Sequence, residues 1–214
     1  MNPLTKRLIA LGASSVIAIT GGILVAPWEG KSNKAYLDMV GIPTVCFGQT
    51  EGVKLGDYRS DEHCEASLAS ELTIYNEGMK NNVRVPLTDY EEIAYTSFVW
   101  NVGLGAWNSS TLLKKLNAGD REGACKQILV WNKATFDKRG AEKQRASGEV
   151  CTAKSSQPGK YSCTVKGLTN RRVAEYQVCM DNNADVTKAL EEVRLLNLNE
   201  GDVSSAPPSE ASGS

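Results

Sequence analysis

The chain has 214 residues, with 24 lysines and arginines against 25 aspartates and glutamates, and a formal net charge of −1. Hydrophobic residues make up 41% of it and charged residues 23%, the proportions of an ordinary globular domain with a sizeable core. The central residues 28–182 carry a net charge of only +1, so we expect no nucleic-acid partner and no partner held mainly by charge.

The N-terminus begins with a long uncharged segment. Residues 8–27 contain no charged side chain and are long enough to cross a bilayer as a helix. Lys6 and Arg7 precede this segment, and positive charges keep that end of a membrane segment in the cytoplasm. A cleaved signal peptide and a buried core helix are the alternatives, but no clean cleavage site precedes Pro27. We therefore expect residues 1–27 to be a retained signal anchor that contacts inner-membrane lipid through residues 8–27.

The following body, residues 28–182, is predicted to be α+β and mostly helical. Residues 35–48 predict one small β-hairpin, because two short alternating segments flank the five-residue loop MVGIP. About five helices follow, and each begins at a residue type that caps helix N-termini. These expected caps are Ser60, Thr88 (with Glu91 as a capping box), Ser109 or Ser110, Asp120 and Thr169.

The end of the body contains a segment of different character. Residues 135–166 have little periodicity and much Lys, Ser and Gly, so we expect an irregular insertion. Beyond the body, residues 185–196 show a short helical pattern. Residues 197–214 are poor in large apolar groups and predict a disordered acidic tail. The chain is thus expected to have three parts: residues 1–27, the body 28–182, and a short helix with this tail, 183–214.

Six cysteines in an exported protein predict disulfides, for which fifteen pairings are possible. We expect Cys151 to pair with Cys163, because two cysteines in one insertion most simply link to each other. Zinc is the alternative, but His63 is the only histidine and no Cys-x-x-Cys pair is present. We therefore expect no metal site and no cofactor. The pairing among the other four cysteines stays open; these are Cys46, Cys64, Cys125 and Cys179.

Two carboxylates and a hydroxyl follow the N-terminal segment at close spacing. Glu29 comes first, Asp38 ends the first hairpin strand, and Thr44 begins the return strand. Cleavage of a glycosidic bond needs a proton donor and a second carboxylate across the sugar. We expect Asp38 and Thr44 to face each other across the hairpin, within reach of one water. The spacing alone is a weak signal, since residue usage produces it by chance in roughly one chain of this length in thirty.

This segment resembles the active-site stretch of glycoside hydrolase family 24, the phage-type lysozymes. The likeness rests on the pair Glu29–Gly30, on the Tyr-x-Asp that ends at Asp38, and on TVCFGQT, which is similar to a strand ending in Gly-His-Thr. Gln49 replaces that histidine, which bears on local stability more than on chemistry. Residues 97–131 and 167–179 are similar to later blocks of the family, in the same order.

The resemblance implies a lysozyme-like fold and a role for each matching residue. Glu29 would be the general acid, and Asp38 with Thr44 would hold the attacking water. Arg171, with Arg172 as the alternative, would pair with the catalytic glutamate.

Three further residues would line the cleft and bind substrate: Asn101, Gly103 and Trp107. Ordinary core packing is the alternative for Asn101 and Trp107. The expected activity is hydrolysis of the β-1,4 bond between N-acetylmuramic acid and N-acetylglucosamine in peptidoglycan by a monomeric phage endolysin, causing host lysis. A lytic transglycosylase and a membrane-anchored peptidoglycan-binding module are the alternatives.

The position of Glu29 just beyond residues 8–27 resembles the signal-arrest-release endolysins of lambdoid phages. In those enzymes a weakly apolar anchor holds an inactive enzyme at the inner membrane and later leaves the bilayer. Residues 8–27 contain no cysteine, which indicates a refolding switch in place of disulfide exchange. The resemblance therefore implies a catalytic domain tethered in the periplasm and then released there.

Overall fold

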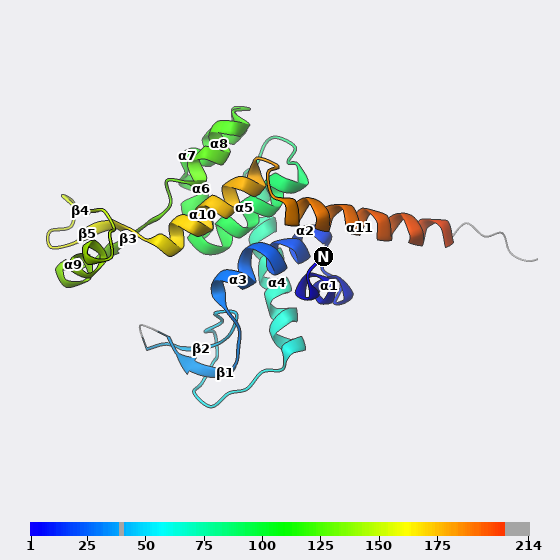
Figure 1. The fold of residues 1–214 in the computed structure, drawn as a ribbon, viewed down its shortest axis with the longest axis horizontal. Helices are drawn as coiled ribbons and strands as arrows, with labels where there is room; N and C mark the ends of the chain where they lie inside the picture. The colour runs from blue at the N-terminus through cyan, green and yellow to red at the C-terminus, as the bar shows by residue number, and fades with distance from the viewer. Residues whose placement is uncertain (39–40, 204–214) are drawn as a thin grey trace, which may run out of the picture.

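The computed structural model describes residues 1–38 and 41–203, with side chains as far as residue 196. The body is built on three helices, α4 (Asp61–Lys80), α5 (Asp89–Val102) and α10 (Lys166–Cys179). Helix α5 lies centrally and packs against both of the others (Figure 1). Its residue Phe98 is fully buried between the rings of Trp107 and Trp131, at centroid distances of 6.4 and 5.5 Å. The expectation of a mostly helical α+β fold is confirmed.

Four of the five expected helix starts are confirmed. Ser60, Thr88, Ser110 and Asp120 accept backbone N–H groups at the first turns of their helices, and Thr88 forms the full capping box with Glu91. Ser110 ends α6 (Leu104–Ser109) and begins α7 (Thr111–Asn117), and Asp120 begins α8 (Arg121–Ile128).

The expected cap at Thr169 is wrong. Helix α10 begins three residues earlier, and the Thr169 hydroxyl donates to the Val165 carbonyl oxygen within the helix, at 3.2 Å. The N-cap position is Val165, which directly follows the strand Tyr161–Thr164 and makes no side-chain capping hydrogen bond. A search for capping residue types therefore does not find this helix start.

The N-terminal segment is folded into the body. It forms α1 (Pro3–Ala10), α2 (Ser15–Ile19), the π-helical turn η1 (Thr20–Val25) and α3 (Ala26–Glu29). Residues 8–27, for which the sequence predicts one membrane-spanning helix, are here divided among these elements. Their apolar side chains, such as Leu8, are buried with those of the body. No helix within the described part of the chain is both long and apolar enough to cross a membrane.

Two glycines allow α1 to lie against η1. A Cβ atom on Gly22 would come within 2.1 Å of the Thr5 hydroxyl oxygen, and one on Gly21 within 2.9 Å of a Leu8 methyl group. The Asn2 amide donates to the Gly22 carbonyl oxygen at 2.8 Å across this contact. The chain reverses between α1 and α2 near Gly12, whose φ of +89° is accessible to glycine at little cost. The glycines that make this segment only weakly apolar therefore permit its packing here.

The expected hairpin is confirmed as β1 (Ser32–Leu37) and β2 (Pro43–Cys46), an antiparallel pair that forms a small lobe beside the helices (Figure 1). A disulfide between Cys46 and Cys64 joins this lobe to the first turn of α4. It fixes one pairing that the sequence left open. A second disulfide, between Cys125 and Cys179, joins α8 to the end of α10.

The register of the hairpin differs from the expectation. Thr44 lies opposite Tyr36, and the Asp38 amide donates to the Ile42 carbonyl oxygen at 3.0 Å. Asp38 and Thr44 are therefore not directly opposite, because Thr44 lies two residues beyond Ile42, the residue to which Asp38 is hydrogen-bonded. Side chains alternate along a strand, so the two lie diagonally on the same face of the hairpin.

The prediction that residues 135–166 are irregular is also wrong. The segment contains β3 (Lys133–Phe136), α9 (Lys138–Ala146), β4 (Cys151–Ala153) and β5 (Tyr161–Thr164), with strand order β3-β5-β4. The predicted Cys151–Cys163 disulfide is confirmed, and it links paired positions of β4 and β5. Strands of three or four residues are too short to show a periodic pattern. The protein thus has a three-stranded sheet in addition to the one hairpin expected.

The C-terminal helix is longer than its pattern indicates. Helix α11 spans Ala184–Val203, so the backbone of residues 197–203, expected to be disordered, continues the helix. The remainder of the expected tail, residues 204–214, lies outside the described residues. The N-terminal ammonium group of Met1 donates to both carboxylate oxygens of Glu192 in α11, at 2.7 and 2.6 Å.

Candidate active site

Glu29 lies at the junction between the N-terminal helices and the hairpin lobe. It is the last residue of α3, which ends because Gly30 adopts a φ of +70°. Its Oε1 lies 2.6 Å from Nη1 of Arg171 in α10, and its side chain is 26% exposed against 5% for the arginine. The carboxylate is therefore held by a buried cation while one side of it stays open to solvent.

The arginine is itself fixed by a buried network. Arg171 donates from Nε to Glu175 at 3.3 Å, and the Ser97 hydroxyl donates to the same oxygen at 2.8 Å. Burial raises the pKa of Glu175, and the neighbouring arginines and the Ser97 hydroxyl lower it. Arg172 lies 3.2 Å from the other oxygen of Glu175 and donates to Asn101 at 2.7 Å. Arg171, the residue preferred from the sequence, is thus the arginine that pairs with Glu29. Arg172 contacts the same Glu175 carboxylate that holds Arg171.

Ser97 and Glu175 are parts of this site that the sequence reasoning did not select. The signal for Glu175 was present, since it stands four residues after Arg171 and such pairs lie on one helix face. Ser97 carries no comparable signal, because a serine within a helix is ordinary. Only the packing of α10 on α5 brings the two together.

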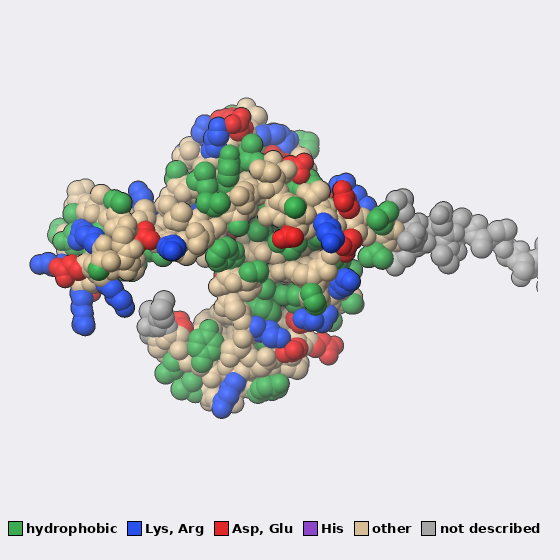
Figure 2. Space-filling model, viewed as in Figure 1, with side chains coloured by type: hydrophobic (Ala, Val, Ile, Leu, Met, Phe, Trp, Pro, Cys, Tyr) green, Lys and Arg blue, Asp and Glu red, His purple; other side chains and the backbone are tan. Residues whose placement is uncertain are grey.

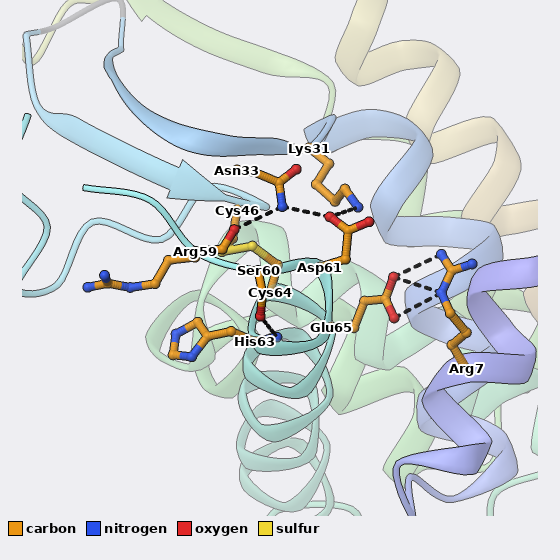
Figure 3. A network of polar contacts seen from close by, with 10 residues as sticks. All are labelled: Arg7, Lys31, Asn33, Cys46, Arg59, Ser60, Asp61, His63, Cys64 and Glu65. Atoms are coloured by element: carbon orange, nitrogen blue, oxygen red, sulfur yellow. Dashed lines mark hydrogen bonds and ion pairs between the residues drawn. A yellow bond between two sulfur atoms is a disulfide. The ribbon is translucent and has the colours of Figure 1, made fainter. Parts of the chain in front are cut away.

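A second set of contacts fixes the chain on the other side of Glu29. Lys31 forms an ion pair with Asp61 at 2.8 Å, and Asn33 donates to the same carboxylate oxygen at 2.6 Å. Nearby, Arg7 of α1 donates to both oxygens of the buried Glu65 at 2.8 and 2.9 Å. Figure 3 shows these groups meeting at the first turns of α4. Helix α4 therefore holds both α1 and the segment just after Glu29.

The turn that follows the hairpin lies against the same carboxylate. A Cβ atom on Gly48, in the turn after β2, would lie 3.8 Å from the Glu29 Oε2 atom. At the far end of the hairpin, Asp38 accepts the Ile42 amide at 2.8 Å, and the buried Thr44 hydroxyl donates to the Ile42 carbonyl oxygen at 3.0 Å. Glu29 thus lies at the base of the hairpin, and Asp38 and Thr44 lie toward its tip.

The three expected substrate-binding residues are placed differently from one another. Asn101 is exposed near the end of α5 and contacts Arg172. Gly103, with a φ of +85°, forms the break between α5 and α6. Trp107 is fully buried and donates to the Met79 carbonyl oxygen at 3.1 Å, so it is a core residue and cannot touch a substrate. For Trp107 the cleft expectation is wrong, because the turn at Gly103 directs α6 inward.

A cavity of about 620 Å³ lies beside the hairpin and not at Glu29. Its lining includes Gln49, His63 and Glu71. Burial raises the pKa of Glu71. A contact with the Gln49 side-chain amide lowers the pKa of Glu71. The nitrogen of that amide makes no hydrogen bond of ordinary length to a described group, so this contact is weak and the effect of burial is the larger one. Glu29, Asp38 and Thr44 are not among the residues that line this cavity, and we assign it no part in the chemistry.

A family model described as phage lysozyme matches residues 26–149, more than half of the chain. The chain belongs to the phage lysozyme family. The matched region contains Glu29, Asp38 and Thr44, and it ends within the unit that contains β3, β4 and β5. The protein is therefore a glycosidase of the lysozyme type.

The relatives of this lysozyme include phage proteins most of whose length it covers. It is 30% identical over 179 residues to the SAR-endolysin of Pseudomonas phage phiKMV, covering 84% of this chain and 96% of that one. It is 34% identical over 137 residues to the SAR-endolysin of Enterobacteria phage P21, covering 61% and 83%.

Solved structures have the same fold. The endolysin from Escherichia coli O157:H7 phage FAHEc1 superposes with a TM-score of 0.60 at 26% identity, covering 77% of this chain and 92% of that one. The active form of P1 phage endolysin Lyz also gives 0.60, at 18% identity, with 83% and 92% covered, and shows the likeness of fold alone.

Proposed function

We propose that this lysozyme hydrolyses the β-1,4 bond between N-acetylmuramic acid and N-acetylglucosamine, with Glu29 as the general acid. The observation that carries the proposal is the position of Glu29, fixed by Arg171 yet open on one side, at the base of the hairpin that bears Asp38 and Thr44. A glycosidase needs this pairing of a proton donor with a second carboxylate on another element.

The two carboxyl groups then have different tasks. Glu29 gives a proton to the leaving glycosidic oxygen, so its contact with Arg171 must lengthen when a sugar enters. The Asp38 carboxylate, with the Thr44 hydroxyl on the same face of the hairpin, orients a water toward the anomeric carbon and accepts the proton that this water loses as it attacks. Water that attacks from the face opposite the leaving group inverts the configuration, as the family resemblance implies.

The test is a turbidity assay on purified cell walls. Glu29→Gln removes the proton donor with little change of shape and should lower the rate by at least about 100-fold, the usual size of a general-acid contribution. Glu77→Gln, an exposed carboxyl on α4 with the same change of charge, is the matched control and should keep full activity. Full activity of Glu29→Gln would refute the assignment. Anhydro-muramic ends in the products would instead indicate a transglycosylase.

We also propose that residues 1–27 first hold the protein in the host inner membrane, with the catalytic domain, residues 28–182, in the periplasm. Glu29 follows residue 27 by two positions, at most about 7 Å of extended chain. While residues 8–27 lie in lipid, Glu29 is held at the membrane surface and α3 cannot bring it to Arg171. The names of the phiKMV and P21 relatives support this proposal.

Release is favoured because the segment has a second place to bury its apolar groups. In the folded body, α1 to α3 bury Leu8, Ile17, Ile19, Leu24 and Val25, so leaving the bilayer does not expose them to water. The test is lysis timing. Ala10→Leu adds apolar surface at an exposed position of α1, so it strengthens the anchor without obstructing the folded state. It should delay lysis and keep the protein longer in the membrane fraction, and unchanged timing would count against anchoring.

A further inference from the structure

Residues 132–166, here called the basic subdomain, differ in charge from the rest of the protein. They contain eight lysines and arginines against three acids, a net charge of +5, so the remainder of the chain carries −6. All but one of the cations are exposed. They are Lys133, Lys138, Arg139, Lys143, Arg145, Lys154, Lys160 and Lys166, of which Lys154 is half-buried.

These cations are not neutralised within the protein. Of the three acids, Asp137 accepts the Gly140 amide at the start of α9, and Glu149 accepts the Thr164 hydroxyl. Across the described ranges, every ion pair of a lysine or arginine lies outside the basic subdomain. Arg145 instead lies over the Tyr161 ring, 5.1 Å from its centroid. The subdomain therefore offers its positive charge to something else.

Hydrogen bonds and the chain itself connect the subdomain to α10, the helix that carries Arg171. The Val165 amide donates to the Asn132 carbonyl oxygen at 2.9 Å, and the Asn132 side chain donates to Thr169 at 3.2 Å. Strand β5 leads into α10, in which Arg171 follows Lys166 by five residues, or about 7.5 Å of helix. The Cys151–Cys163 disulfide and the sheet hold the cations in one arrangement.

The figures show where this unit lies relative to the hairpin. In Figure 1 it projects to the left of the helices, and the β1–β2 lobe projects below them. In Figure 2 a hollow separates the two lobes, and Lys and Arg side chains extend from the basic subdomain toward the hairpin side of that hollow. A polymer that passes Glu29 would run between them.

We propose that the basic subdomain binds the carboxylates of the peptide stems carried by the peptidoglycan strand. This rests on the proposed action of the Glu29 site on peptidoglycan. A glycan strand is itself nearly neutral, but its stems repeat anionic carboxylates along its length, and exposed cations attract such groups from several ångströms away. An anionic lipid surface has complementary charge too. Within residues 132–166, however, Val150 is the only large hydrophobic side chain that is well exposed, which leaves no apolar face to enter a membrane.

The test compares two triple variants in a Glu29→Gln background, so that binding is measured without hydrolysis. Lys138→Gln/Arg139→Gln/Lys143→Gln removes three exposed cations of α9. Arg84→Gln/Lys114→Gln/Lys188→Gln removes the same three charges from exposed positions elsewhere. Each is titrated by sedimentation with three materials: intact sacculi, stem-free glycan and phosphatidylglycerol vesicles. The stem-free glycan is prepared with an amidase, and the lactyl carboxylates that the amidase frees on the muramic acids are then converted to amides, so that the glycan carries neither stems nor their charge.

We expect the α9 variant to bind intact sacculi about 5- to 20-fold more weakly at low salt, with a flatter dependence on salt concentration. Its binding to stem-free glycan should equal that of the control variant. Equal binding of both variants to intact sacculi would overturn the proposal. So would an equal loss on stem-free glycan, or a loss confined to the vesicles.

Two further measurements keep these outcomes separate from other failures. If α9 unfolds in the triple variant, as thermal melting would show, Lys133→Gln/Lys160→Gln tests the same charge effect on β3 and on the loop before β5. Hydrolysis of stem-free glycan by the protein with Glu29 intact tests the active site alone. Its absence would refute the proposed function, whereas its presence with unchanged stem binding would refute only the role of the basic subdomain.

Discussion

The close contact between α1 and η1 predicts that any side chain in place of Gly22 destabilises the folded protein. A Cβ atom there would lie 2.1 Å from the Thr5 hydroxyl oxygen, 2.9 Å from the Asn2 side-chain oxygen and 3.0 Å from the Thr5 amide nitrogen. Neither neighbour is free to move, because Thr5 is fully buried and the Asn2 oxygen accepts the Thr5 amide as the cap of α1. Gly22→Ala must therefore displace α1 or break its cap.

The magnitude follows from two opposing effects. Alanine in place of a helical glycine stabilises by up to about 1 kcal/mol. Overpacking a tight contact costs about 1–3 kcal/mol, and loss of a cap costs about 1 kcal/mol. We expect Gly22→Ala to lower the free energy of unfolding by about 1–2 kcal/mol, which lowers Tm by roughly 2–8 °C for a protein of this size.

Gly105 provides the matched control. It lies in α6, and a Cβ atom added to it would meet no neighbouring atom within 4 Å. Gly105→Ala therefore gains helix propensity without a clash and should leave Tm unchanged or raise it. Thermal melting of the purified proteins by circular dichroism measures both. If Gly22→Ala were as stable as Gly105→Ala, α1 would not pack on η1 as described, and the reasoning would fail.

Three further changes test other contacts. Arg7→Gln leaves the buried Glu65 without its cation, so we expect the free energy of unfolding to fall by about 1–2 kcal/mol, whereas Arg7→Lys should restore most of it in the same denaturant titration. Burial raises the pKa of Glu71 above its ordinary 4.5, so the folded protein binds more protons than the unfolded chain just above pH 4.5. Stability should therefore fall as pH rises from 4.5 through the raised pKa, and Glu71→Gln should flatten that part of a stability–pH curve; parallel curves would contradict the burial. Replacing Cys125 and Cys179 by serine opens a loop of 54 residues and should destabilise by about 4 kcal/mol in equilibrium unfolding, and a change below about 1 kcal/mol would argue against this cross-link.

The sequence was most informative where chemistry and local geometry coincide. The resemblance of the segment that contains Glu29, Asp38 and Thr44 to the phage-type lysozymes located the candidate site, and the helix caps from Ser60 to Asp120 follow from interactions within four residues. The cysteine pair Cys151–Cys163 was predictable for the same reason, since its two members lie within one insertion. In each case the partners are close along the chain.

The failures concern contacts made across the fold. Nothing local distinguishes Trp107 as a core residue from a residue of the cleft, because the turn at Gly103 decides its direction. The register of the hairpin depends on how β1 and β2 pair on either side of the loop, which places Thr44 opposite Tyr36. The net charge of the body, nearly zero, hid a strongly basic subdomain because averaging over residues 28–182 cancels charges that are separated in space.

The sequence by itself determined the kind of chemistry, the helical character of the body and the weakly apolar nature of the N-terminal segment. Only the tertiary structure decided which arginine holds Glu29 and where residues 1–27 bury their side chains in the folded protein. The physical reason is that apolar groups need burial but do not specify where. Lipid and a protein core both satisfy Leu8 and Ile19, and the choice depends on the contacts that α4 and α5 offer to them.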